Sequence, residues 1–491
     1  MSGPAAGLGT RAARGAVVTM TGQVGRIAVQ VLSVVVLARL LLPSDYGLLA
    51  MVVAVVGVAE VFRDFGLSSA AIQAKNLSSV QRSNLFWINT GIGVLLACVA
   101  AAAAPLVADL YDEPRLVDMT RVLALTFVLN GLSTQYRADL NRRMLFMRLA
   151  VADTVGPATA LVVAVCCALL GAGYWALVAQ QLTQAAVMLV VVVANARWAP
   201  NLPRRHVDME GLLRFGWNLV GTQLIGYAAN NLDSVIIGSR FGAASLGSYN
   251  RAFQLLMTPL NQIRAPSTTV ALPVLSRLQD ERERFDFFVR RGQLALGYTL
   301  VPGLALVIGG AGPVTELFLG ERWASVEPIL RLLACAGIFQ TLSYVGYWVY
   351  LAKGLTRDLF QYSLITAAIK VTCILVGSTW GVVGVAAGYA LAPALAWPLS
   401  LWWLSRRADL SSRPLYGGAA RIVLTGVVAA AGSATASVLT EGLPAYVGLG
   451  AAVIGTVLTV GVLLLVVRPV RRDVAALVTM GREAVRRRST R

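Results

Sequence analysis

Residues 16–40 read AVVTMTGQVGRIAVQVLSVVVLARL, an apolar stretch with one arginine, Arg26, well inside it. A membrane-spanning helix needs about 20 mainly apolar residues, so this stretch is long enough to cross a bilayer. Arg11 and Arg14 precede it, as in a secretory signal peptide. However, the stretch continues to about Leu42, and many similar stretches follow. The segment is therefore interpreted as the first of a series of membrane helices.

The composition of the whole chain agrees with a membrane protein. Of its 491 residues, 57% are hydrophobic and 13% are charged, whereas soluble domains carry about 25% charged residues. The net charge of +18 is spread over many loops and is not gathered on one soluble face, so nucleic acid is not an expected partner. Anionic lipid headgroups are the expected partners of these basic loops.

The length criterion of roughly 20 apolar residues predicts about fourteen membrane helices. Their expected ranges are 16–40, 46–66, 84–107, 119–138, 149–170, 173–195, 212–237, 246–270, 292–312, 327–351, 359–378, 381–404, 419–439 and 446–467.

Basic residues indicate how these helices are oriented. If the N-terminus lies inside, the inner loops hold 32 of the 42 Lys and Arg residues, and the outer loops hold only four. Cytoplasmic loops of membrane proteins keep Lys and Arg, whereas translocated loops lose them. An odd number of helices would reverse this alternation in half of the chain. The pattern therefore predicts an even number of helices, with both termini in the cytoplasm.

A weak internal repeat becomes visible when the sequence is shifted by 200 residues. The shift crosses six predicted helices, so the two copies would have the same orientation, as two lobes related by an axis along the membrane normal. A substrate site between the lobes would be expected. The paired positions include Gln23 and Gln223, Gln30 and Asn230, Leu32 and Leu232, and Gly47 and Gly247. The predicted regions are a cytoplasmic N-terminus (1–15), an N-lobe of six helices (16–200), a C-lobe of six helices (201–405), two further helices (406–468) and a basic cytoplasmic tail (469–491).

The chain lacks the sequence signals of an enzyme. It has no phosphate-binding glycine loop, no metal-ligand cluster and no serine–histidine arrangement. The acid pair Asp112–Glu113 is interpreted as a solvated loop pair. All five cysteines lie in apolar stretches, which indicates core residues rather than disulfides or metal ligands. Neither catalytic residues, a metal nor a cofactor is expected, and a proton or sodium gradient is the candidate source of energy.

Polar side chains recur at helical spacing on three of the predicted helices, and each set shares one helix face. Hydrogen bonding between membrane helices is one explanation, and a hydrated cavity is the other. Because two of the sets lie on repeat-related helices, the cavity is the favoured interpretation. The candidate cavity residues are Gln23, Arg26 and Gln30 on the first helix, Gln223 and Asn230 on the seventh, and Arg251 and Gln254 on the eighth.

Such a cavity would carry net positive charge, and arginine binds phosphate through a fork of donors. Four other basic residues lie within predicted helices without an assigned role: Arg39, Arg264, Arg331 and Lys370. Among these, Arg264 lies off the polar face of the eighth helix. Asp233 flanks the polar face of the seventh helix, where three roles remain open: counter-ion of a cavity arginine, structural cap, or proton or sodium site.

Several stretches of the sequence resemble one family of membrane proteins, over about residues 16 to 400. They resemble the polysaccharide-transporter, or Wzx-type, branch of the multidrug/oligosaccharidyl-lipid/polysaccharide (MOP) exporter superfamily, and most of all its lipopolysaccharide, O-antigen and teichuronic-type flippases. The stretches are LARLLLPSDYGLLAMV (37–52), DFGLSSAAIQ (64–73), LFWINTGIG (85–93), YDEPRL (111–116), LRFGWNLVGTQLIGYAANNLDSVIIGSRFGAASLGSYNRAFQL (213–255), LPVLSRLQD (272–280) and GERWASVEPILRLLA (320–334).

The resemblance implies two lobes of six helices plus two C-terminal helices. It also implies a bacterial plasma-membrane protein that flips an undecaprenyl-diphosphate-linked oligosaccharide by alternating access. In the family, cavity arginines bind the diphosphate, and Arg26 is the best match here, with Arg251 or Arg264 as further candidates. Asp233, in NNLDSVIIG, matches a recurrent aspartate of the family. Polysaccharide polymerases and glycosyltransferases are the expected protein partners.

Two other functions are considered. A drug exporter of the same superfamily would need a more acidic cavity for cationic drugs, which the excess of arginine disfavours. A non-transporting scaffold of a polysaccharide synthesis complex would not need the polar faces at all.

Overall fold

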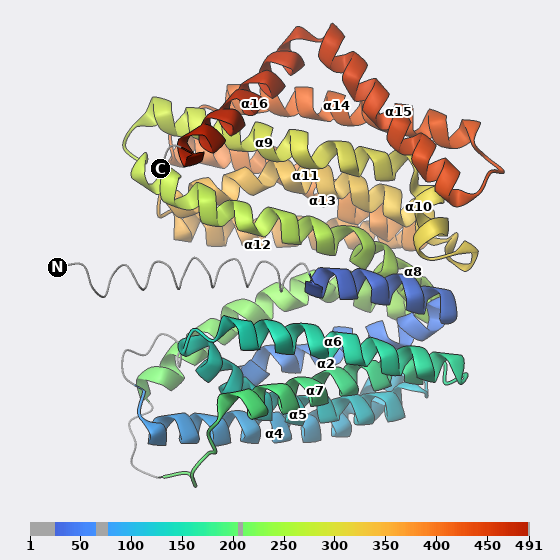
Figure 1. The fold of residues 1–491 in the computed structure, drawn as a ribbon, viewed down its shortest axis with the longest axis vertical. Coiled ribbons are helices and arrows are strands. Elements are labelled where there is room, and N and C mark those ends of the chain that lie inside the picture. Colours follow the sequence, from blue (N-terminus) through green and yellow to red (C-terminus); the bar gives the residue numbers. More distant parts are fainter. Residues whose placement is uncertain (1–24, 65–76, 205–209, 490–491) are drawn as a thin grey trace. The chain divides into compact units, whose positions relative to one another are not determined.

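The computed structural model describes residues 25–64, 77–204 and 210–489, and every regular element within these ranges is a helix (Figure 1). Ten helical stretches in the described chain are long and apolar enough to cross a membrane. One of them, Thr356–Arg407, contains two successive helices. The predicted all-helical membrane class is thus confirmed. The number of fourteen helices and the cytoplasmic location of both termini stay predictions.

The chain divides into two compact units, and the first extends from Met1 to Gly247. Its long helices run side by side as a bundle in Figure 1. The elements are a helix over residues 25–40, α2 (Pro43–Asp64), α4 (Ser79–Tyr111), α5 (Leu116–Arg142), α6 (Phe146–Leu169), α7 (Trp175–Ala196) and the first part of α8 (Glu210–Arg277).

The second unit extends from Ser248 to Arg491 and begins with the remainder of α8. The division falls within α8, whereas the predicted lobe boundary at residue 200, which rests on the repeat, stays a prediction. The further elements are α9 (Arg282–Gly309), α10 (Ala311–Phe318), η1 (Glu321–Trp323), α11 (Val326–Ala352), α12 (Thr356–Gly377), η2 (Ser378–Trp380), α13 (Gly381–Arg407), α14 (Ser412–Leu439), α15 (Ala445–Val466) and α16 (Arg468–Ser489).

The start of α4 illustrates how local sequence fixes a helix end. The hydroxyl of Ser78 accepts a hydrogen bond from the backbone N–H of Gln81 at 3.1 Å, and the Gln81 side chain accepts one from the N–H of Ser78 at 3.0 Å. This reciprocal capping box satisfies two N–H groups that have no partner within the helix. The helix ends at Asp112, which adopts the left-handed conformation (φ 51°).

Glycines determine the path of α8 and its close contact with α2. Gly242 has φ 77° and ψ 179°, a conformation open to glycine that separates the predicted helices 212–237 and 246–270. Further along, a Cβ atom on Gly247 would overlap the carbonyl oxygen of Pro43, and one on Gly47 would overlap the carbonyl oxygen of Ala243. The two glycines that the repeat pairs in sequence therefore allow α2 and α8 to pack backbone against backbone within the first unit.

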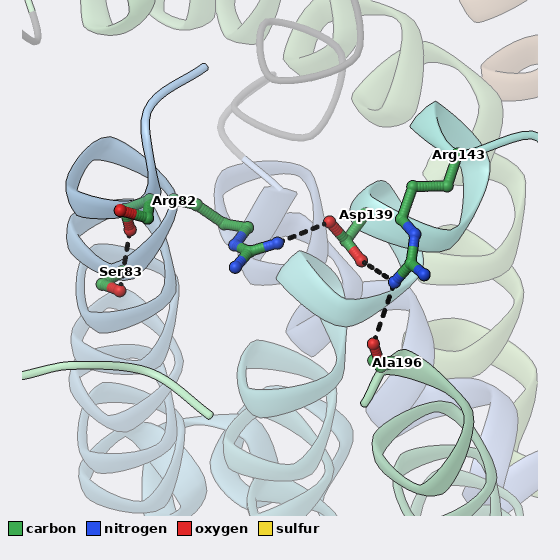
Figure 2. Close-up of polar contacts among 6 residues, drawn as sticks. Arg82, Ser83, Asp139, Arg143 and Ala196 are labelled. Carbon is green, nitrogen blue, oxygen red and sulfur yellow. Dashed lines mark hydrogen bonds and ion pairs between the residues drawn. The ribbon is translucent and has the colours of Figure 1, made fainter. Parts of the chain in front are cut away.

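A buried carboxylate joins three helices at one end of the first bundle (Figure 2). Asp139 accepts hydrogen bonds from Arg82 on α4 at 3.0 Å and from Arg143, at the end of α5, at 3.3 Å. Arg143 also donates to the carbonyl oxygen of Ala196, at the end of α7, at 3.0 Å. The guanidinium of Arg82 lies 4.2 Å from the ring of Trp198. The basic residues at this end of the bundle therefore stabilise helix packing.

A second carboxylate anchors the C-terminal helix α16 to the second unit. Asp473 is buried and accepts a hydrogen bond from Nε of Arg421 on α14 at 2.6 Å. The hydroxyl of Tyr298 and the guanidinium of Arg290, both on α9, approach the same carboxylate at 3.5 and 4.0 Å. The helix α16 is thus attached through its first two turns.

Candidate functional site

The predicted cavity residues of the first helix differ in their surroundings. Arg26 and Gln30 are exposed on the helix over residues 25–40, and Gln23 lies outside the described residues. Ser33, three residues after Gln30 and thus on the same helix face, accepts a hydrogen bond from the side chain of Gln180 on α7 at 2.8 Å. Part of this polar face therefore holds two helices together, while Arg26 and Gln30 are accessible to a ligand.

The predicted residues of the seventh helix lie in the first part of α8. Asn230 is exposed, and the side chain of Gln223 lies outside the described residues. Asp233 is buried, with only 2% of its surface exposed, and its carboxylate accepts a hydrogen bond from the N–H of Ser234 at 2.9 Å. Burial of Asp233 is compatible with each of the three roles considered for it, so the choice between them stays a prediction.

The predicted residues of the eighth helix lie in the second unit. Arg251 is buried, with 7% of its surface exposed. Gln254 is half-buried, and its amide donates a hydrogen bond to the side chain of Asn250 at 2.9 Å. Because these two residues belong to the second unit and Arg26 to the first, their grouping in one cavity stays a prediction.

Arg264 lies off the predicted polar face of its helix, yet it is more deeply buried than Arg251, with 4% of its surface exposed. Its Nη2 donates to the side-chain oxygens of Asn261 at 2.6 Å and Gln340 at 3.2 Å. Its guanidinium lies 5.7 Å from the ring of Tyr344. Among the described residues, its Nε finds no acceptor and no carboxylate lies within ion-pair distance.

A second cation is connected to Arg264 through neutral side chains. The amide of Gln340 on α11 donates to the hydroxyl of Tyr389 on α13 at 3.3 Å. The ammonium of Lys370 on α12 lies 5.0 Å above the ring of Tyr389. Four helices of the second unit thus bring an arginine and a lysine to one polar network. Charge buried among membrane helices is costly, and such residues typically mark a ligand pathway.

The two other unassigned basic residues have ordinary surroundings. Arg331 is half-exposed and pairs with Glu327, one turn earlier on α11, at 2.5 Å. Arg39 is exposed near the end of its helix. Of the four, Arg264 combines burial with a polar network, and the half-buried Lys370 belongs to the same network, so these two are the functional candidates.

The two loop acids, predicted to be a solvated pair, differ in their surroundings. Asp112 is exposed, and Glu113 accepts a bidentate hydrogen bond from Arg115 at 2.7 and 2.8 Å. Hydrogen bonding to this guanidinium lowers the pKa of Glu113 below its usual value. Within the described residues, no group of three or more His, Cys, Asp and Glu side chains could hold a metal ion, and the expected absence of a metal stays a prediction.

The sequence and the fold were compared with known proteins. The family described as "Polysaccharide biosynthesis protein" matches residues 36–328. The chain is similar to the lipopolysaccharide biosynthesis protein WzxC of Escherichia coli, with 24% identity over 74% of this chain and 75% of the relative. It is also similar to the succinoglycan biosynthesis transport protein ExoT of Rhizobium meliloti, with 25% identity over 81% and 82%.

The fold is similar to that of a solved lipid II flippase, MurJ, in an inward closed conformation. The TM-score is 0.68, with 13% sequence identity, and the match covers 91% of this chain and 98% of that structure. At this low identity the likeness concerns the fold alone, and it supports the all-helical membrane class predicted from the sequence.

Proposed function

Since this chain belongs to the polysaccharide biosynthesis protein family, in the Wzx-type branch of the MOP superfamily, we propose that it flips an undecaprenyl-diphosphate-linked oligosaccharide across its membrane by alternating access. The chain is a multi-pass protein of the bacterial inner membrane and a transporter rather than an enzyme. The identity of the lipid, the diphosphate link and the alternating-access cycle are the proposed parts.

The observation that carries this proposal is the burial of Arg264 among membrane helices without a carboxylate partner in the described chain. A diphosphate offers several anionic oxygens, and a guanidinium binds them through paired hydrogen bonds. Lys370, linked through Gln340 and Tyr389, would supply a second positive charge to the same anion. Arg26 is the corresponding candidate in the first unit, because its side chain is exposed.

The remaining parts of the substrate would use weaker contacts. Exposed amides such as Gln30 and Asn230 would bind sugar hydroxyls, and the lipid tail would remain in the bilayer. Asp233 is a candidate for coupling to a proton or sodium gradient, because it is a buried acid of the first unit. Polymerases and glycosyltransferases of the same polysaccharide would be functional partners.

The two rival functions predict different chemistry. A drug exporter that handles cationic compounds would place carboxylates in its binding site, whereas the network around Arg264 contains amides, phenols and a second cation. A scaffold without transport activity would not gain from a buried charge that costs stability. The network therefore favours an anionic substrate.

The proposal is tested with Arg264→Leu in reconstituted vesicles that contain a fluorescent lipid-linked oligosaccharide. Charged hydrogen bonds contribute about 1.5–3 kcal/mol, so the loss of Arg264 should slow flipping by about tenfold to hundredfold. Because the residue is a buried charge without an acid partner, its replacement should leave thermal stability unchanged or raise it. Arg331→Leu is the matched control, since Arg331 is half-exposed and paired with Glu327.

Normal flipping by the Arg264→Leu protein would contradict the assigned diphosphate site. The same vesicles test Arg26→Gln, for which a similar loss of flipping is expected. Absence of flipping by the wild-type protein, together with normal surface polysaccharide in a deletion strain without a redundant flippase, would contradict the proposed function as a whole.

A further inference from the structure

The first unit contains a pocket of about 280 Å³ between α2, α5 and α7. Most of its wall is apolar and includes Phe127, which is itself buried. Its polar lining consists of one carboxylate, three amides and one hydroxyl. They belong to Glu60, Thr126, Asn130, Gln181 and Gln184. None of these residues belongs to the arginine network described above.

The three amides of this pocket do not join helices through hydrogen bonds. The side chains of Asn130, Gln181 and Gln184 make no hydrogen bond to any described residue. Elsewhere on α7 the amides are bonded, because Gln180 donates to Ser33 and Asn195 donates to the carbonyl oxygen of Val191. Amides that join membrane helices would be bonded in the same way. The pocket amides are instead available to a ligand.

The shape of the pocket wall depends on a close contact with α8. Tyr227 donates a hydrogen bond from its hydroxyl to the carbonyl oxygen of Val53 at 2.7 Å, and Val53 lines the pocket. A Cβ atom on Gly57, also in the lining, would overlap the Tyr227 hydroxyl. A glycine at this position therefore allows the tyrosine to brace α2 next to the pocket.

We propose that this pocket is a subsite for one sugar residue of the transported oligosaccharide, an inference that rests on the proposed function. Amides both donate and accept hydrogen bonds, as sugar hydroxyls do, and a carboxylate accepts from two hydroxyls. The aliphatic wall offers an apolar surface to the C–H face of the sugar. The volume of about 280 Å³ lies just below the roughly 300–1,000 Å³ typical of small-molecule sites, which suits a single ring.

A bound metal cation is the main alternative occupant of the pocket. Oxygen ligands surround such an ion at about 2.3–2.6 Å, so it occupies a compact, polar site. This pocket is larger than such a site and is lined mainly by aliphatic and aromatic carbon. The three free amides and the apolar wall therefore favour a sugar.

The test uses the full chain in lipid nanodiscs and saturation-transfer NMR with free monosaccharides. The probes are a hexose, an N-acetylhexosamine and a hexuronate, each added alone. At least one should receive magnetisation from the wild-type protein, and this transfer should fall at least tenfold in the Gln181→Leu/Gln184→Leu variant. The matched control is Asn195→Leu on the same helix, outside the pocket, which should retain the signal.

A wild-type protein that binds none of the three sugars would overturn the proposal, as would a double variant that binds them normally. If NaCl but not choline chloride stabilises the wild-type protein, and the double variant loses this effect, the pocket is a cation site. This result would also overturn the sugar proposal. An assay of lipid-linked oligosaccharide flipping in vesicles distinguishes failure of this inference from failure of the proposed function. If the wild-type protein flips the lipid-linked oligosaccharide and the double variant does so with unchanged KM, the sugar subsite is wrong while the flippase function stands.

Discussion

The carboxylate of Asp139 provides the most direct test of how the first unit is stabilised. It is 6% exposed and accepts hydrogen bonds from Arg82 and Arg143, which come from different helix ends (Figure 2). Asp139→Ala removes both bonds at once and leaves two arginines without their acceptor. We expect the ends of α4, α5 and α7 to loosen, because Arg143 also connects Asp139 to Ala196.

The expected loss follows from the two contacts. A hydrogen bond to a charged group contributes about 1.5–3 kcal/mol, and an exposed ion pair at most about 1 kcal/mol. The Arg82 side chain is 27% exposed and lies 3.0 Å from the Asp139 carboxylate, so its contribution is placed near the lower end of the first range. The Arg143 side chain is 46% exposed and lies 3.3 Å from the Asp139 carboxylate, so this ion pair is treated as a surface pair. Together they predict a loss of about 1.5–2.5 kcal/mol of unfolding free energy.

Equilibrium unfolding in mixed micelles, with a rising fraction of SDS, measures this loss. A double-mutant cycle with Arg82→Ala and Asp139→Ala should give a coupling energy above about 1 kcal/mol. Asp118→Ala is the control on the same helix, because Asp118 is 76% exposed and lies 4.0 Å from its arginine partner. A coupling energy below about 0.5 kcal/mol, or equal losses for the Asp118 and Asp139 variants, would refute the reasoning.

Three further predictions concern other parts of the chain. Gly47→Ala should destabilise the protein by about 1–3 kcal/mol, because the added Cβ atom would overlap the backbone of α8. Gly91→Ala is the control and should be neutral, because a Cβ atom at Gly91 would meet no atom within 4 Å. Equal thermal stability of the two variants would contradict this prediction. Asp473→Asn weakens the 2.6 Å contact with Arg421, so trypsin should remove α16 about tenfold faster. An unchanged cleavage rate would argue against the role of Asp473 in attaching α16. Pairing lowers the pKa of Glu113 below its ordinary value of about 4.5, so its stabilisation is present above that pH and disappears as the pH falls through the lowered pKa. Between pH 5 and 3 the wild-type protein should therefore lose up to about 1 kcal/mol more than Glu113→Gln, and parallel stability curves would contradict the prediction.

Helical phase was an incomplete guide to the candidate site. It placed Arg251 on a polar face, and the structure places that residue in a buried position. It set Arg264 aside, because the side chains that surround Arg264 are not on the same helix. Gln340 is 76 residues away in sequence, and Tyr389 lies on a third helix. A pattern within one helix cannot identify partners that packing brings from others.

The repeat gave a different kind of result. A shift of 200 residues pairs Gly47 with Gly247, and these two glycines lie at the close approach of α2 and α8. The sequence indicated which positions correspond, but it gave no sign that they are neighbours. The close approach depends on the kink at Gly242 and on the path of two helices, so it is a property of the folded chain.

The membrane class, the helical architecture and the family could all be predicted from the amino-acid sequence alone. Each depends on local composition, since about 20 apolar residues make a span and charged loops interrupt the spans. The tertiary structure decided which polar side chains are satisfied by neighbours and which remain available. Ser33 is bonded to Gln180, whereas the amides of Gln181 and Gln184 are free. Such differences arise because a hydrogen bond needs two groups at the correct distance, and for residues on separate helices only packing sets that distance.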